Sequence, residues 1–72
     1  NSQGGKMMSL IKKTVIPLGR PLYIPKEDNL SLDQLEIEST GSYQLIDKED
    51  YVVIKNDECC RSIQVTVTRR DS

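Results

Sequence analysis

The 72-residue chain has no histidine, no tryptophan and no phenylalanine, and its aromatic residues are three tyrosines. Without histidine it lacks the usual general base near neutral pH, and its four glycines form no phosphate-binding loop. No apolar run approaches the ~18 residues that a membrane-spanning helix needs. We therefore expect no enzyme, no catalytic, cofactor-binding or metal-binding residues, and no membrane span.

The length is enough for one small domain. A chain this short buries roughly 60% of the surface that its unfolded form exposes, so its stability needs help from a cross-link or a partner. The polar, glycine-bearing start predicts a flexible N-terminal arm over residues 1–12, followed by a single small β-rich domain over residues 13–72. Because the first residue is Asn1 and not methionine, we expect a segment excised from a larger protein.

The net charge of −1 hides a strong asymmetry. Residues 27–58 carry a net charge of −8, and the two ends together carry +7. A nucleic-acid-binding surface normally gathers lysine and arginine with aromatic residues among them, which three scattered tyrosines do not provide. We expect no nucleic-acid partner, and we expect the basic ends to attract the acidic middle in the folded chain.

An internal repeat marks two turns. Residues 24–32 recur as residues 46–54, twenty-two positions later, and each copy has an apolar residue, a Lys-Glu-Asp corner and then apolar residues two apart. In the second copy, residues 43–46 and 51–55 are rich in β-branched and aromatic residues on either side of the corner. This pattern predicts a β-hairpin.

Other segments also read as strands. Residues 62–68 alternate apolar and polar side chains without a fault, which indicates a strand with one buried face. Residues 14–24 contain Pro17 and Pro21 around Gly19, so we expect an irregular edge strand with a turn at the glycine.

Residues 29–40 admit two interpretations. Ser31 and Gln34 have the spacing of a helix capping box, whereas the repeat argues for a strand and a turn, which we favour. The overall prediction is an all-β fold, a small antiparallel sheet or sandwich of four to six short strands, with one short helical turn near Ser31 as the variant. The expected core residues are Ile24, Leu30, Leu32, Leu45, Val52, Ile54, Ile63, Val65 and Val67.

Cys59 and Cys60 are the only cysteines and are neighbours. A disulfide between adjacent cysteines closes a strained eight-membered ring, so a structural bond between them is not expected. A vicinal-dithiol switch and a metal site remain as alternatives, although a metal would need two further ligands. We favour one buried thiol and one cysteine whose partner lies outside this chain.

Asn29-Leu30-Ser31 is an N-glycosylation sequence in an expected turn, so Asn29 is a candidate glycosylation site. Together with cysteines that lack a suitable partner in a small β-rich chain, it favours an extracellular or secreted protein.

A family resemblance rests on a glycine-containing turn, an acidic corner, a strand and a cysteine: Gly41-Ser42-Tyr43-Gln44-Leu45, Asp50-Tyr51-Val52-Val53-Ile54, Cys60 and Ile63-Gln64-Val65. The stretch resembles the opening of the first chondroitin-sulfate-proteoglycan-type segment in the Fraser-complex proteins of the extracellular matrix. The chain departs from that pattern in its second cysteine, Cys59, and in lacking the downstream cysteine that a family disulfide would use. The resemblance implies an extracellular β-rich repeat in matrix adhesion, with calcium or glycan as accessories.

These observations lead to a non-enzymatic protein-recognition or adhesion module, acting through an exposed strand edge near residues 14–23 or along residues 62–68. Two alternatives are an intracellular regulator that uses the dithiol of Cys59 and Cys60, and a small structural subunit that completes its core by forming a homo-oligomer.

Overall fold

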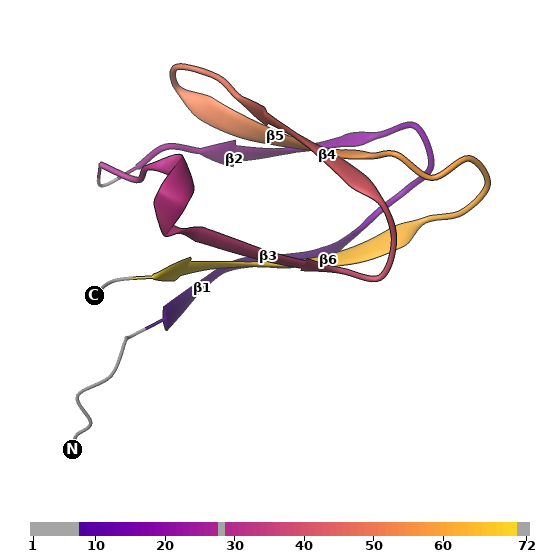
Figure 1. The fold of residues 1–72 in the computed structure, drawn as a ribbon, viewed down its shortest axis with the longest axis horizontal. Helices are drawn as coiled ribbons and strands as arrows, with labels where there is room; N and C mark the ends of the chain where they lie inside the picture. The colour runs from indigo at the N-terminus through magenta and orange to yellow at the C-terminus, as the bar shows by residue number, and fades with distance from the viewer. Residues whose placement is uncertain (1–7, 28, 71–72) are drawn as a thin grey trace.

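Two three-stranded antiparallel sheets lie face to face in the computed structural model, which describes residues 8–27 and 29–70 (Figure 1). The first sheet has the strand order β1-β6-β3 and the second β2-β5-β4. The predicted all-β fold is confirmed, and the elements in chain order are β1 (Met8–Ile16), β2 (Pro21–Pro25), the 3-10 helix η1 (Leu32–Gln34), β3 (Leu35–Ser39), β4 (Tyr43–Asp47), β5 (Tyr51–Asn56) and β6 (Ile63–Arg70).

The core lies between the sheets, because alternate residues of the central strands β5 and β6 point inward, and Val53, between two of these residues on β5, is buried as well. Ile16, at the end of β1, is buried and was missing from the expected core. Leu45 was expected there, but its side chain is 39% exposed because β4 is an edge strand. The buried cluster consists of Ile16, Ile24, Leu30, Val52, Ile54, Ile63, Val65 and Val67, with Leu32 packed against it.

The chain changes sheet within a segment that we expected to be one irregular strand. Residues 14–24 belong partly to β1 in the first sheet and partly to β2 in the second. The turn between them places Gly19 at φ 74°, and the Arg20 N–H donates to the Pro17 carbonyl at 3.1 Å. Pro17 and Pro21 flank this turn, so it separates two strands and does not merely bend one.

β1 begins earlier than the expected domain. Met8 to Lys12 lie within β1, although residues 1–12 were expected to form a flexible arm. The remaining part of that predicted arm, residues 1–7, lies outside the described residues.

Residues 29–40 follow both interpretations in succession. A capping box lies at the start of η1, where the Ser31 N–H donates to Gln34 Oε1 at 3.1 Å. The Ser31 hydroxyl also donates to Asp33 Oδ1 at 2.6 Å. β3 then starts at Leu35. The helical turn near Ser31 and the strand after it are therefore both present.

Lys26, in the first Lys-Glu-Asp copy, lies beside the second corner, and the two copies serve different connections. The second corner closes the predicted β4–β5 hairpin, with the Lys48 N–H donating to the Tyr51 carbonyl at 2.9 Å. The first follows β2 on the way to η1, and Lys26 donates its N–H to the Asp50 carbonyl at 2.9 Å. Lys26 Nζ also lies 2.6 Å from Asp47. The internal repeat thus brings its two copies together at one end of the second sheet.

Within the described residues, no helix has the length and apolar character to cross a membrane.

Candidate functional site

β1 is the longest strand among residues 8–27 and 29–70, with nine residues, and within these residues it pairs on one side only. Residues 62–68 are not an edge, because β6 pairs with β1 on one side and β3 on the other, so the expectation of a free edge there is wrong. We call the backbone of Met8–Ile16 that faces away from β6 the β1 edge. It lies within the other stretch in which an open edge was expected.

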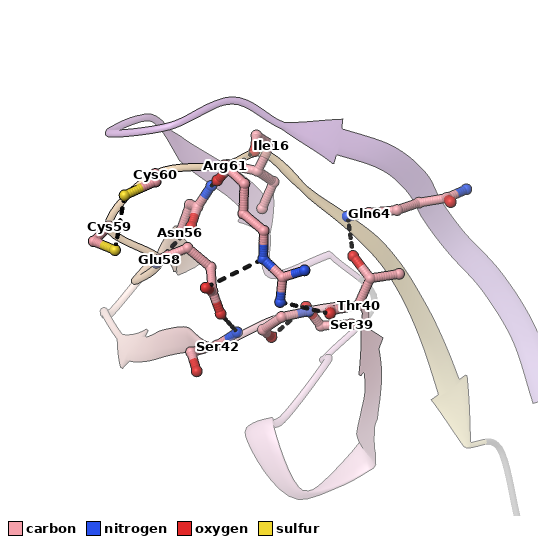
Figure 2. Close-up of polar contacts among 11 residues, drawn as sticks. Ile16, Ser39, Thr40, Ser42, Asn56, Glu58, Cys59, Cys60, Arg61 and Gln64 are labelled. Atoms are coloured by element: carbon pink, nitrogen blue, oxygen red, sulfur yellow. Dashed lines mark hydrogen bonds and ion pairs between the residues drawn. The ribbon is translucent and has the colours of Figure 1, made fainter.

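The hydrogen-bond pattern of β6 shows which groups of β1 face outward. Gln64 directs its backbone toward the β3 side: its carbonyl accepts from the Thr40 N–H at 3.0 Å, and its N–H donates to Thr40 Oγ1 at 2.9 Å (Figure 2). Val15 is the residue opposite Gln64 on the other side, and Lys13 lies two positions before it. Because backbone groups alternate in direction along an antiparallel strand, the N–H and C=O of Lys13 and Val15 point away from β6.

β2 offers a poorer edge. The Asn56 N–H donates toward Arg20, so by the same alternation the residues of β2 that face outward are Pro21, Tyr23 and Pro25. Proline has no N–H, which leaves Tyr23 as the one outward donor of this five-residue strand.

Charge also distinguishes the two edges of the first sheet. β1 carries Lys12 and Lys13 and no acidic residue, whereas β3 carries Glu36 and Glu38 and no basic one. The apolar side chains of Leu10 and Val15 are 63% and 55% exposed. A shift of register between Leu10 and Lys12 interrupts the pairing with β6, so the regular part of the β1 edge is Lys12 to Ile16.

Next to the end of β1, a cysteine-bearing loop joins β5 to β6 (Figure 2). Its anchor is Asn56, the buried polar residue at the end of β5, with 4% exposure. The Asn56 amide donates to the carbonyls of Ile16 at 3.1 Å and Arg61 at 2.9 Å, and its Oδ1 accepts the Glu58 N–H at 2.7 Å. One side chain therefore ties both ends of the loop to β1.

Glu58 and Arg61 fasten the loop to the connection between β3 and β4. The Glu58 carboxylate accepts the Ser42 N–H and the Arg61 Nε–H, the latter at 3.2 Å, and Arg61 Nη2 donates to the Thr40 carbonyl at 3.3 Å. The hydrogen bond from Ser42, with that from Arg61 second, lowers the pKa of Glu58. No sequence motif marks this network, which joins residues up to 21 positions apart.

Glu58→Gln should make stability less dependent on acid pH. Because the folded state lowers the Glu58 pKa, the carboxylate stabilises the fold above its ordinary pKa of about 4.3, and this stabilisation is lost as the pH falls through the lowered value. We expect the variant to unfold more easily than the parent chain at pH 7 and the gap to close in acid. Urea unfolding across the pH range measures the gap, and a gap of constant size would contradict this role for Glu58.

Gly41 has no room for a side chain at this end of the sandwich. A Cβ atom there would lie 2.7 Å from the buried Ile63 side chain and 2.8 Å from the Glu58 carboxylate. We expect Gly41→Ala to cost about 1–3 kcal/mol of unfolding free energy through overpacking. Ser42→Ala, which retains the Ser42 N–H, is the matched control, and equal urea midpoints for the two variants would contradict the steric argument.

Cys59 and Cys60 are both free and exposed at the tip of the loop. The expectation of a buried thiol is therefore wrong. Their Sγ atoms lie 3.0 Å apart, and the contact with Cys59, followed by desolvation and the charge of Glu58, raises the pKa of Cys60. In the described part of the chain, no group of three or more His, Cys, Asp or Glu side chains is placed to hold a metal ion.

Asn29, the candidate glycosylation site, is exposed in the turn before η1 and has a left-handed backbone with φ 59°. The next residue, Leu30, is buried in the core, which fixes the turn and leaves Asn29 at the surface.

No protein-family model, no curated protein and no solved structure matches the chain.

Proposed function

We propose that this chain is a non-enzymatic protein-recognition module that binds an extended, acidic segment of a partner protein along the β1 edge. The observation that carries the proposal is the outward direction of the Lys13 and Val15 backbone groups on a long edge strand that has lysines and no acid. Such groups can pair with an added strand, and the lysines favour carboxylates on it.

The other edges support this choice. Two prolines remove outward N–H donors from β2. β3 and β4 are each five residues long and carry acidic side chains, among them Glu36, Glu38 and Asp47. Lysines and bulges on an edge also discourage uncontrolled pairing between identical copies. β1 therefore combines a barrier to self-association with a preference for an oppositely charged strand.

Adhesion outside the cell is the setting that we propose for this activity. The exposed Asn29 turn supports it, because a glycan there would extend from the surface without disturbing the core. A partner strand that pairs with β1 would join two proteins through backbone hydrogen bonds, and such a joint suits a role in adhesion.

Binding of designed peptides tests the proposal. A seven-residue peptide of alternating valine and glutamate should bind the 72-residue chain at least about tenfold more tightly than the valine–lysine counterpart, a difference of about 1.4 kcal/mol. Lys13→Glu leaves one lysine and one glutamate on β1, so it should abolish the preference, and added salt should reduce the preference of the parent chain because exposed charges are screened. Calorimetric titration or chemical-shift titration provides the affinities. Equal binding of the two peptides would contradict the charge argument.

Backbone variants test the edge itself. Val15→Pro removes an outward N–H without removing a hydrogen bond between β1 and β6, so it should abolish peptide binding in a chain that remains folded. Val15→Thr keeps the N–H and is the matched control. Leu45→Pro provides the same comparison on the β4 edge. If Leu45→Pro abolishes binding and Val15→Pro does not, the proposed edge is wrong.

A further inference from the structure

The loop between β5 and β6 holds its two thiols on one side. In an extended chain, neighbouring side chains point to opposite faces, which keeps adjacent sulfur atoms apart. Here the chain bends at both cysteines, and the Sγ atoms of Cys59 and Cys60 approach to 3.0 Å (Figure 2). A disulfide bond needs about 2.05 Å, so closing the ring requires the two sulfur atoms to move about 1 Å closer.

The loop keeps this shape without using the sulfur atoms. Asn56 holds the backbone at Arg61 and Glu58 on either side of the cysteines, at 2.9 and 2.7 Å. Arg61 and Glu58 are also joined to each other and to the chain near Ser42. Because the anchors are a side-chain amide, a carboxylate and a guanidinium, they remain available whether the thiols are reduced or oxidised.

We propose that Cys59 and Cys60 are a redox-modification site that closes reversibly to a vicinal disulfide by exchange with a small-molecule disulfide such as oxidised glutathione. One cysteine thiolate attacks the glutathione disulfide, forms a mixed disulfide and releases one glutathione thiolate. The neighbouring cysteine, as a thiolate, then attacks the protein sulfur of that mixed disulfide and releases the second glutathione. The two cysteine sulfurs are oxidised by two electrons in total, the glutathione disulfide is reduced to two thiols, and the two cysteine protons pass to the released glutathiones.

The location of the pair favours this chemistry over the two alternatives. Metal binding would have only two sulfur ligands, because the described residues bring no third candidate ligand into a group with them. A permanent disulfide to another protein would need only one of the two cysteines. It would give no role to the 3.0 Å distance between the Sγ atoms of Cys59 and Cys60. The strain of an eight-membered ring makes the bond easy to reduce, so the site responds to the redox state of its surroundings.

Mass spectrometry of the 72-residue chain in glutathione redox buffers tests the proposal. As the buffer becomes oxidising, we expect a monomer that has lost two hydrogens and both reactive thiols and that a dithiol reductant restores. Cys59→Ser and Cys60→Ser should each stop at the mixed disulfide with glutathione. If the parent chain also stops there, or forms a disulfide-linked dimer, the proposal is overturned.

A short peptide with the sequence of residues 57–62 measures the contribution of the fold. We expect the equilibrium constant for ring closure by glutathione disulfide to be about tenfold larger in the folded chain than in the peptide. This factor is equivalent to about 30 mV in reduction potential. Equal ring-closure constants in the chain and in the peptide would show that the loop does not hold the thiols in place. That result would also overturn the proposal. Neither experiment involves peptide binding at β1. The redox proposal can therefore fail while the proposed function holds, and the proposed function can fail while the redox proposal holds.

Discussion

Replacing Ile54 with alanine should lower the free energy of unfolding by about 2–5 kcal/mol. Ile54 is fully buried at the centre of the second sheet and packs between the two layers. The substitution removes three methyl or methylene groups from a closely packed core and leaves a cavity. A chain of this size has little stability to spare, so we expect the variant to be partly unfolded at 25 °C.

Leu45→Ala is the matched control for this variant. Leu45 lies directly opposite Ile54 on β4, but it is 39% exposed. Since much of its side chain already contacts solvent, we expect its loss to cost about 1 kcal/mol or less. Urea unfolding followed by circular dichroism compares the two variants, and similar losses would contradict a core that lies between two sheets.

Replacing Asn56 with alanine should cost about 2–4 kcal/mol, because it removes one hydrogen-bond partner from each of three backbone groups at once. The carbonyl of Ile16, which also faces Ile63 of β6, loses the additional donor that Asn56 supplies in the interior. We also expect faster amide exchange at Glu58, whose N–H loses its acceptor.

Asn56→Asp separates hydrogen bonding from packing, since the two side chains have nearly the same shape. The carboxylate still accepts from Glu58 but cannot donate to the carbonyls of Ile16 and Arg61, and it brings a negative charge toward their oxygens. We expect it to be at least as destabilising as alanine at pH 7 and to recover part of the stability in acid, when the group is protonated. Urea unfolding at the two pH values is the measurement, and parent-like stability at pH 7 would contradict the anchoring role of Asn56.

Local patterns predict much of this fold. The hairpin around residues 47–50 follows from its β-branched flanks and polar corner, and the alternation in residues 62–68 correctly identifies which face of β6 is buried. The capping-box spacing of Ser31 and Gln34 marks the position of η1. Each of these features depends on residues that are close in sequence, so the pattern contains the information.

Long-range pairing could not be predicted in the same way. Whether β6 lies at the centre or the edge depends on β1 and β3, which are separated from it in sequence, and an alternating strand fits either position. The same limit applies to Asn56, whose partners Ile16 and Arg61 lie 40 and 5 positions away. Exposure of both cysteines depends on how this anchored loop bends, which their adjacency alone does not reveal.

The charge asymmetry has a partial counterpart in the structure. Acidic β3 lies beside β6, and Arg70 approaches Glu36 at 3.7 Å. This contact is exposed enough to contribute little stability. On the opposite edge of the same sheet, Lys12 and Lys13 of β1 are exposed to solvent.

Residue-resolved amide hydrogen exchange, with and without the valine–glutamate peptide, tests recognition at the β1 edge most directly. The account predicts that the amides of Lys13 and Val15 exchange rapidly in the free chain and become protected when the peptide binds, while that of Thr14 is protected in both states. Protection that appears at Tyr43 and Leu45 of β4, or no change at Lys13 and Val15 in the bound state, would contradict it.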